Sequence, residues 1–258
     1  MESFSIIKCP QFLENAISPP AKEIGTTVAN VFHLVFSPIN YNVEKLRIKQ
    51  AENLKMYGSE IEKELSKIPE EKLIEPPISI IGPALEASKF YIDEKEMREM
   101  FSKLIASSMN MDTSSKAHHS FVEIIKQLSP MDASNLKIIS NSKGGLPIAE
   151  YKINVNTGGS NTIFTHVFLS NPIYDNKDEI AASISNLIRL GLISVTYSSY
   201  LINPELYSIF DNDLIYKNIV KEVNTLAGKL NYPYTSAEYQ KGVTIITPLG
   251  KTFSTICF

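Results

Sequence analysis

Histidine is the residue from which this chain would most readily build a metal site or a general base, and it contains four of them. His118 and His119 are adjacent, so on any regular element their rings point in different directions and form a poor pair of metal ligands. The only acidic residue shortly before them is Asp112. His33 and His166 each stand alone in an apolar stretch, where a packed histidine is more common than a ligand. The histidines therefore predict neither a metal site nor a catalytic base.

Glycine pairs and carboxylate pairs also lack the context that chemistry needs. Gly144-Gly145 and Gly158-Gly159 do not belong to a GxGxxG or GxxxxGK pattern, so no phosphate-binding loop is predicted. The pairs Glu70-Glu71 and Asp93-Glu94 stand at expected helix edges, where solvation and capping account for them. No GxSxG, HExxH or CxxC sequence occurs. We therefore expect no catalytic residues, no cofactor and no small-molecule substrate, and a protein that is not an enzyme.

The composition is that of an ordinary globular protein, with 43% hydrophobic and 21% charged residues among 258. A net charge of -3 argues against a dedicated nucleic-acid coat, because phosphate binding needs clustered Lys and Arg. Cys9 and Cys257 are too few for a disulfide framework and favour reduced thiols in the cytosol. The longest uncharged stretch, between Glu23 and Glu44, contains several Thr and Asn residues and is broken by Pro38, so it predicts no transmembrane helix. The start of the chain does not read as a secretory signal, and we expect a cytoplasmic protein.

Two helices with different surfaces are expected near the start of the chain. The first spans 21–36 and has one continuous apolar face. That face suits a helix packed in the core, which we favour, or a helix that contacts a membrane; its only nearby cation is Lys22, whereas interfacial helices carry several. The second helix, at about 43–68, has a narrow apolar seam between charged residues and predicts an arm that packs lengthwise on another helix. The candidate membrane contacts are Val28, Phe32, Val35 and Phe36.

A compact helical bundle is expected from about 83 to 140. Pro83 suits the first position of a helix. The capping-box spacings of Asp93 with Glu96 and of Ser120 with Glu123 predict two further helix starts. Another helix is predicted to begin near Pro130, and the connections between these helices are short, which is typical of a bundle.

Residues 141–258 have a mixed pattern that predicts a winged-helix-like region. Alternation on both sides of Gly158-Gly159 predicts a β-hairpin. A helix from Asp178 to Leu190 is followed by Gly191 as its C-terminal cap and then by a short strand. A helical insertion at about 204–230, a return strand and a TPLG step into a last helix complete the order. We therefore predict a mainly α fold with minor β (α+β), in which an N-terminal helical bundle within residues 1–140 precedes this region.

A winged-helix-like region raises the question of DNA binding, because the helix 178–190 would then enter the major groove. That helix opens with Asp178-Glu179, which would repel phosphate, and the basic residues around it are few. We therefore favour a protein-contact role over DNA binding, since fold alone does not decide between them. The candidate DNA contacts are Lys177, Asn186, Arg189, Lys241 and Lys251.

The middle of the chain contains a series of strings in a fixed order: PP at 76–77, IGPALEA at 81–87, YIDE at 91–94, MREMF at 97–101, LIASSM at 104–109 and SFVEIIKQLSP at 120–130. With this series the chain resembles the bacterial abortive-infection alpha (Abi-alpha) family, a domain-of-unknown-function family. The similarity is densest in the predicted bundle and extends from about Pro20 to Phe253. One departure is His119, where the family pattern has proline after the histidine that matches His118.

The resemblance implies a bacterial cytoplasmic protein linked to phage defence by abortive infection, in which an infected cell stops growing before phage mature. The family brings no catalytic residues that could be carried over to this chain. We therefore expect a phage-defence factor that acts without catalysis, through a protein partner or self-association. Two alternatives stay open: a DNA-binding regulator that uses the helix 178–190, and a membrane-active effector that exposes the helix 21–36 on activation.

Overall fold

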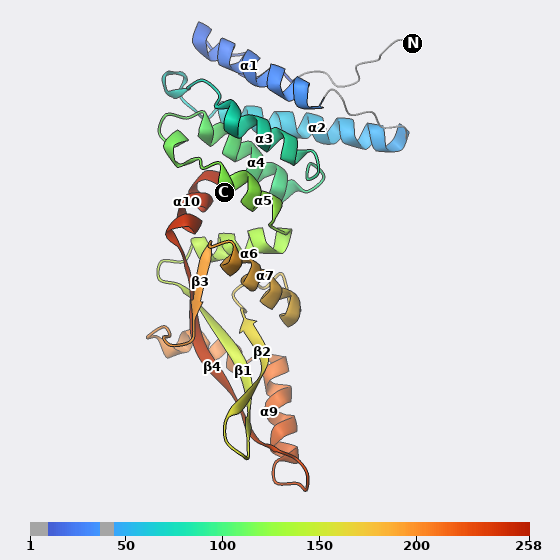
Figure 1. Ribbon diagram of the computed structural model, residues 1–258, viewed down its shortest axis with the longest axis vertical. Coiled ribbons are helices and arrows are strands. Elements are labelled where there is room, and N and C mark those ends of the chain that lie inside the picture. Colours follow the sequence, from blue (N-terminus) through green and yellow to red (C-terminus); the bar gives the residue numbers. More distant parts are fainter. Residues whose placement is uncertain (1–9, 37–43) are drawn as a thin grey trace. The chain divides into compact units, whose positions relative to one another are not determined.

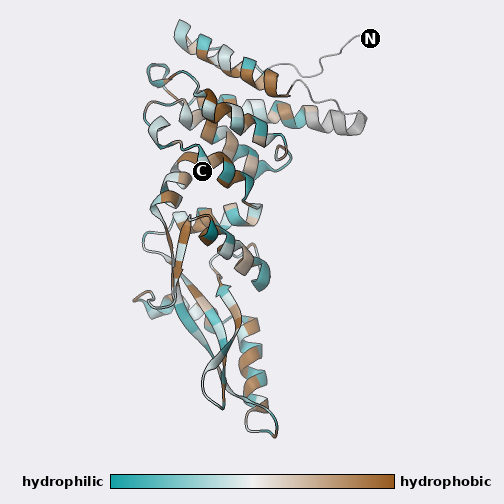
Figure 2. Ribbon diagram, in the orientation of Figure 1, coloured by the Kyte–Doolittle hydropathy of each residue, from teal (hydrophilic) through white to brown (hydrophobic). Residues whose placement is uncertain are grey.

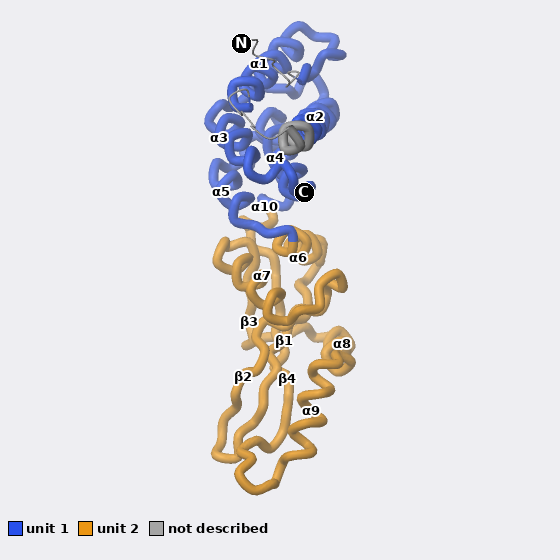
Figure 3. The backbone as a smooth tube through the Cα atoms, turned by 90° about the vertical axis from the view of Figure 1, so that its right-hand side faces the viewer, with its two compact units in different colours: residues 1–130, 252–258 blue, residues 131–251 orange. Residues whose placement is uncertain are grey.

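The computed structural model describes residues 10–36 and 44–258. These residues form two compact units (Figure 3): unit 1 contains the described residues up to 130 together with 252–258, and unit 2 contains residues 131–251. Unit 1 is helical, whereas unit 2 combines helices with a four-stranded sheet (Figure 1), so the fold is α+β as predicted. Cys9, Pro38 and Val43, on which parts of the sequence reasoning rested, lie outside the described residues.

Unit 1 is organised around α4 (Lys95–Ser108), whose apolar residues recur at intervals of three and four and are buried. Helix α2 (Glu44–Leu65) packs along α4, which confirms the predicted lengthwise packing of this charged helix. The described part of its seam is buried because that side faces α4, and Glu60 beside the seam pairs with the buried Arg98 of α4 at 3.0 Å. The buried seam residues are Leu54, Tyr57, Ile61 and Leu65.

Two shorter helices also contact α4, namely α3 (Ile78–Ser88) and α5 (Ser120–Lys126). Apolar residues gather on these helices and on α4 (Figure 2), as expected where they face one another. Two 3₁₀ turns, η1 (Glu70–Lys72) and η2 (Ser114–Lys116), lie in the connections between helices.

Helix α1 (Pro19–Phe36) packs on the rest of unit 1 through an aromatic cluster. The ring centroid of Phe32 lies 5.9 Å from that of Phe12, 4.6 Å from that of Phe36 and 6.0 Å from that of Tyr57. The segment at Phe12 crosses α1 at Gly25, where an added Cβ would lie 2.0 Å from the Phe12 carbonyl oxygen. The apolar face of α1 is therefore part of the core.

The sequence predicted that Pro83 begins a helix, but Pro83 lies inside α3. Because proline has no N–H, the Ser79 carbonyl four residues earlier loses its helical donor. The Nδ1 of His119 lies 3.3 Å from that carbonyl oxygen and takes the place of the missing donor. The helix continues through Pro83 with this partner from a distant loop, which local spacing could not reveal.

The two predicted capping boxes are displaced by one residue. Helix α4 has Glu94 as its N-cap, and the Oδ1 of Asp93 instead accepts a hydrogen bond from Asn53 at 2.5 Å. Helix α5 begins with Ser120 itself, and the Nδ1 of His118 accepts from the Ser120 backbone N–H at 3.1 Å. Asn53 thus satisfies the Asp93 carboxylate, and His118 satisfies the Ser120 backbone N–H, in place of the partners that the capping boxes predicted.

The last residues of the chain complete unit 1. Helix α10 (Pro248–Cys257) carries Phe253, whose ring centroid lies 5.3 Å from that of Phe121 in α5. The hydroxyl of Ser107 in α4 donates to the Ile256 carbonyl at 3.2 Å. Residues 252–258 therefore fill the core of a unit whose other residues lie more than a hundred positions earlier.

Unit 2 is built on an antiparallel sheet with strand order β2-β1-β4-β3. The predicted hairpin is confirmed, since β1 and β2 pair across the turn at Gly158-Gly159. In the centre, Tyr151 of β1 pairs with Phe164 of β2 and with Tyr239 of β4. The other elements flank this sheet (Figure 1). In chain order, the strands and the helices α6 and α7 are α6 (Pro130–Ser140), β1 (Leu146–Val155), β2 (Ser160–Val167), α7 (Lys177–Arg189), β3 (Ile193–Thr196) and β4 (Tyr234–Ile246).

A helical insertion separates β3 from β4 and covers one face of the sheet (Figure 3). The sequence predicted a helical insertion at about 204–230, and the insertion consists of η3 (Pro204–Tyr207), α8 (Ser208–Asp211) and α9 (Leu214–Leu226). The break falls at Asn212–Asp213, where Asp213 becomes the N-cap of α9. Figure 2 shows bands of apolar and polar residues along α9, which packs its apolar side on β4.

The core between the insertion and the sheet is largely aromatic. Tyr207 and Phe210 point inward from η3 and α8 and are buried with Tyr151 of β1. The Tyr207 hydroxyl donates to the Gly242 carbonyl of β4 at 2.7 Å, so its polar end is satisfied inside this core. Partly buried residues that pack on the cluster are Phe164, Leu169, Leu201, Ile215, Tyr216, Ile219 and Tyr239.

Candidate interaction surface

Lys177, the first candidate DNA contact, is buried within unit 2, with 7% of its side chain exposed. Its Nζ lies 3.3 Å from Oδ1 of Asp213, and the other oxygen of that carboxylate accepts a hydrogen bond from the Tyr151 hydroxyl at 2.7 Å. Burial and this carboxylate raise the pKa of Tyr151. The ammonium therefore joins α7 to the helical insertion, and this position argues against a phosphate contact at Lys177.

Asn186 and Arg189 are also engaged within unit 2. The Nδ2 of Asn186 donates to Oδ2 of Asp132 in α6 at 3.0 Å, and its Oδ1 accepts from Arg189 at 2.7 Å. Asn186 is thus half-buried against α6, whereas Arg189 bonds to Asn186 of its own helix and stays exposed. Among the exposed residues of α7 are Asp178 and Glu179, which carry the wrong charge for phosphate.

The two remaining candidates lie on other elements. The Nζ of Lys241 in β4 lies 5.1 Å from the centroid of the Tyr207 ring, a cation–π contact. Lys251 is exposed on α10. Lys177, Asn186 and Lys241 thus already hold parts of unit 2 together, and none of these placements favours a DNA-binding face.

The candidate membrane contacts belong to the core of unit 1. Val28, Phe32 and Phe36 are buried, and Val35 is half-buried. A membrane could reach these side chains only if α1 left unit 1. The burial of these side chains therefore agrees with the prediction that this helix packs in the core. Among residues 10–36 and 44–258, the structure contains no helix with the length and apolar character needed to cross a membrane.

The histidines of unit 1 have local roles or face solvent. His118 caps α5 and His119 supports α3, as described above. His33, expected to be packed, is exposed, because it lies on the side of α1 opposite its apolar face. Within the described part of the chain, no group of three or more His, Cys, Asp or Glu side chains could hold a metal ion.

The face of the sheet opposite the insertion carries a polar cluster that the sequence did not reveal. His166 has a left-handed backbone (φ 50°), and its Nδ1 lies 2.9 Å from the Tyr197 hydroxyl. That hydroxyl also accepts from the His166 backbone N–H at 3.2 Å, so it donates to Nδ1. The Tyr197 ring lies against Gly242, where a Cβ would come within 2.6 Å of it. Because residue 242 has no side chain, the Tyr197 ring can pack directly on the sheet.

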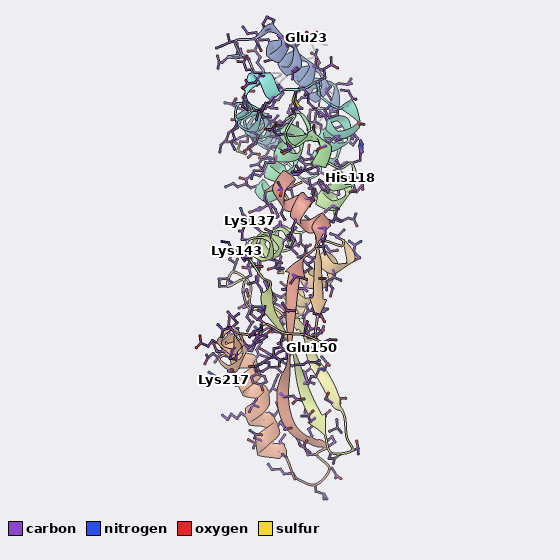
Figure 4. The ribbon with its side chains drawn as sticks, turned by 90° about the vertical axis from the view of Figure 1, so that its left-hand side faces the viewer. Glu23, His118, Lys137, Lys143, Glu150 and Lys217 are labelled. Atoms are coloured by element: carbon purple, nitrogen blue, oxygen red, sulfur yellow. The ribbon has the colours of Figure 1, made fainter. Side chains whose placement is uncertain are left out.

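Charged neighbours extend this cluster across β1 and β4 (Figure 4 labels Glu150 on β1). The Glu150 carboxylate accepts from the Thr165 hydroxyl at 3.2 Å and pairs with Lys152 at 3.0 Å. Lys152 also donates to the side-chain oxygen of Gln240, whose amide donates to the Tyr197 carbonyl at 3.2 Å. Each charged group in the cluster therefore has a partner within it.

The chemistry open to this cluster is limited by these pairings. Burial raises the pKa of Tyr197 to about 12, and the Glu150 charge acts in the same direction. Burial lowers the pKa of His166 against the opposite influence of Glu150, so its imidazole is neutral near pH 7. The Nδ1 lone pair is held by the Tyr197 hydroxyl, and that phenol does not ionise near neutrality. The cluster therefore ties three strands together rather than offering a free base.

The two edges of the sheet are poor sites for strand addition. Strand β2 moves three residues, from Val167 to Phe164, while β1 moves two, from Ala149 to Tyr151; a second register shift follows directly. Such bulges twist an edge strand and interrupt its pairing. The opposite edge, β3, has four residues (Ile193–Thr196). Partners are therefore not expected to bind along the strand edges of this sheet.

A cavity of about 320 Å³ lies in unit 1 between the ends of α2, α4 and α10. Lys67 in its wall pairs with Glu64 at 2.6 Å, and Lys103 donates to the Phe258 carbonyl. Because helix C-termini carry partial negative charge, these lysines compensate the ends of the helices that meet there. The contacts of Lys67 and Lys103 within unit 1 therefore explain why charged residues line the cavity.

The outer side of the insertion, in contrast, exposes large apolar side chains that no described element covers. Ile202 is 98% exposed and Leu214 is 74% exposed. The rigid aromatic core beneath holds Leu201, Tyr207 and Phe210, so the intervening residues must face outward. Exposed apolar groups of this density mark contact surfaces more often than ordinary surface. We define the apolar patch as Tyr200, Ile202, Leu206, Ile209 and Leu214.

The sequence contained a partial signal for the apolar patch. The segment from 200 to 214 is rich in apolar residues, but its inward and outward positions cannot be separated without knowing where η3 and α8 break. Once Tyr207 and Phe210 are known to be buried, the remaining apolar residues have no place left in the core. The patch is therefore a property of the fold that periodicity alone leaves ambiguous.

Comparisons with known proteins give one family and one solved structure. The family model described as Abortive infection alpha matches residues 49–257, which is most of the chain. No curated protein matches the sequence. The solved structure of an uncharacterized protein from the hydrocarbon-degrading marine bacterium Alcanivorax borkumensis SK2 is similar at 14% identity and a TM-score of 0.31, over 57% of this chain and 94% of that one. A TM-score at this level supports no conclusion about fold or function.

Proposed function

Because the chain belongs to the abortive infection alpha family, we propose that it acts in abortive infection, in the cytoplasm of a bacterium. On this proposal it works without catalysis, through protein contacts, and the apolar patch is the contact surface. The family name supports the biological role, and the patch supports the mode of action.

The observation that carries the mode of action is the exposure of the apolar patch on a firmly anchored insertion. Tyr207 and Phe210 fix η3 and α8 to the sheet, and the Lys177–Asp213 pair fixes the start of α9 to α7. A surface held in this way loses little conformational freedom when a partner binds, so more of the apolar burial is available as affinity.

The order of elements in the second half of the chain suits a contact module. Helix α7, strand β3, strand β4 and helix α10 follow one another as in a winged helix, with the insertion in place of a simple wing. On our proposal, this winged-helix-like region binds protein through the insertion, and the N-terminal helices form the bundle that accompanies it. The engagement of Lys177 and Asn186 within unit 2 is why we favour protein over DNA as the partner.

The proposal is tested by phage challenge of bacteria that carry the chain. Ile202→Asp and Leu206→Asp place a carboxylate in the apolar patch, where a partner would have to bury it. We expect both variants to lose protection against any phage that the natural chain restricts, measured as efficiency of plating across a phage panel. Because both residues are exposed, far-UV circular dichroism and thermal melting of the purified variants should match the natural chain.

The matched control is Ile173→Asp, which alters an isoleucine that is 73% exposed in unit 2 but lies outside the patch. This variant should protect as well as the natural chain does. Full protection by both patch variants, at normal expression, would remove the patch from the mechanism. Loss of protection in the control as well would show that the patch has no special role.

A further inference from the structure

The surface around the apolar patch has a charge distribution that identifies the kind of partner it fits; this step rests on the proposed contact function. Glu205 in η3 and Asp211 at the end of α8 are exposed in the part of the insertion that precedes α9. The Asp211 carboxylate also faces Tyr239, whose pKa it helps to raise. The η3–α8 segment therefore exposes two carboxylates.

The first half of helix α9 supplies the opposite charge. Leu214, Lys217 and Lys221 lie three and four residues apart, so they share one side of the helix. Lys217 and Lys221 are exposed, and Lys217 is labelled on α9 in Figure 4. In chain order Leu206, Ile209 and Leu214 lie between Glu205 and Lys217, whose Nζ donates to Oδ1 of Asn212 at 3.3 Å, and the exposed Glu222 follows Lys221.

We infer that a second copy of this chain covers the apolar patch, through a two-fold contact between the two insertions. A two-fold axis that lies in the helical layer near Leu214 places the η3–α8 segment of one copy on α9 of the other. Glu205 and Asp211 of each copy then face Lys217 and Lys221 of its partner. Leu214 meets its own symmetry mate at the axis, and Leu206 and Ile209 bury against the apolar stems of the lysines.

The area available fits such a contact. The five side chains of the patch expose on the order of 600 Å² together, at the upper end of what single-chain proteins leave uncovered. A standard interface takes about 800 Å² from each partner, which the patch supplies with the stems of the flanking charged residues. The strand edges do not offer an alternative two-fold contact, because β2 is bulged and β3 is short.

The inference is tested by sedimentation equilibrium of the full chain across the micromolar range. We expect a reversible dimer of twice 28.8 kDa, weakened at least tenfold by Leu206→Asp and unaffected by Ile173→Asp. Glu205→Lys and Lys217→Glu should each weaken the dimer several-fold by placing like charges together. The double variant Glu205→Lys/Lys217→Glu should regain dimer affinity, because it reverses both partners of the same contact.

A natural chain that sediments as a monomer at every concentration overturns the inference, and so does a dimer that Leu206→Asp leaves intact. The outcomes separate this inference from the proposed function. If the natural chain is monomeric while patch variants still lose phage protection, the patch binds another protein and the second copy is excluded. If the dimer forms as described but patch variants protect normally, self-association through the patch stands and the proposed role of the patch in defence does not.

Discussion

The Lys177–Asp213 pair makes the sharpest test of how the insertion is anchored. Lys177 is 7% and Asp213 11% exposed, and Asp213 also accepts the Tyr151 hydroxyl at 2.7 Å. Replacing Asp213 with alanine leaves a buried ammonium and a buried phenol without their acceptor. Removing one member of a buried, hydrogen-bonded ion pair costs about 3–5 kcal/mol, because the remaining charge is stranded.

We therefore expect Asp213→Ala to lower the free energy of unfolding of unit 2 by about 3–5 kcal/mol, or its melting midpoint by on the order of 10 °C. Urea denaturation followed by far-UV circular dichroism measures the loss. Hydrogen exchange localises it, since amides of α7, α9 and β1 should lose protection while those of α4 keep it. The matched control is Lys143→Met, which alters an exposed lysine of unit 2 outside both the pair and the apolar patch and should change stability by less than about 0.5 kcal/mol.

A double-mutant cycle shows whether the two charges act on one another. Lys177→Met combined with Asp213→Ala removes both charges, so the double variant should be more stable than the sum of the single losses predicts, by about 1–3 kcal/mol. Strict additivity would mean that the pair is not coupled. A loss below about 1 kcal/mol in Asp213→Ala would refute the anchoring role itself.

Three further outcomes follow from the fold. The pKa values of Tyr197 and Tyr239 are raised from 10.0 to about 12, so the stability gained by keeping these phenols neutral is complete below pH 10 and is lost as the pH rises toward 12. Alkaline unfolding, followed by phenolate absorbance, should therefore begin above pH 10. A smooth ionisation of all tyrosines near pH 10 in the folded state would contradict this prediction. Gly25→Ala should destabilise unit 1, because its Cβ would lie 2.0 Å from the Phe12 carbonyl. Gly82→Ala in α3 should cost less, because its Cβ has open space and is restricted only by the ring of Pro83 that follows it; thermal melts that rank the two variants the other way would contradict the packing at Phe12. Phe253→Ala should destabilise unit 1 by about 3–5 kcal/mol in urea, and a near-neutral effect would show that residues 252–258 are not part of its core.

Elements with a strong periodic pattern could be predicted from the sequence. The seam of α2 followed from intervals of three and four between Leu54, Tyr57, Ile61 and Leu65, since these place all four side chains on one side of a helix. The hairpin followed from alternation on both sides of a glycine pair, because glycine accepts the positive φ that the turn requires. In each case the signal lies within a few residues of the structure that it specifies.

Features that depend on distant partners could not be predicted in the same way. The continuation of α3 through Pro83 depends on His119, and the burial of Lys177 depends on Asp213, 36 positions later. A lysine just before a helix reads as an exposed cation unless its acceptor is known. For this reason residue type alone predicts DNA contacts at Lys177, Asn186 and Lys241, whose side chains make contacts within unit 2.

The polar cluster on the sheet was missed for a related reason. Its members come from β1, β2, β4 and the segment after β3, and the bulge that turns His166 toward Tyr197 leaves no mark in the residue pattern. The apolar patch was partly visible as apolar density, but the break at Asn212–Asp213 that orients it was not. Both features need the tertiary fold before their positions can be assigned.

The most direct measurement compares two sets of variants in one phage-infection assay. One set alters the apolar patch (Ile202→Asp, Leu206→Asp), and the other alters the polar cluster with little change in shape (Glu150→Gln, Tyr197→Phe). Survival of the culture and phage yield are measured for each variant, at matched expression and with folding checked on the purified protein. A chain that acts through contacts should lose defence in the patch set and keep it in the cluster set. Loss of defence in correctly folded cluster variants, with the patch variants still active, would contradict that mode of action.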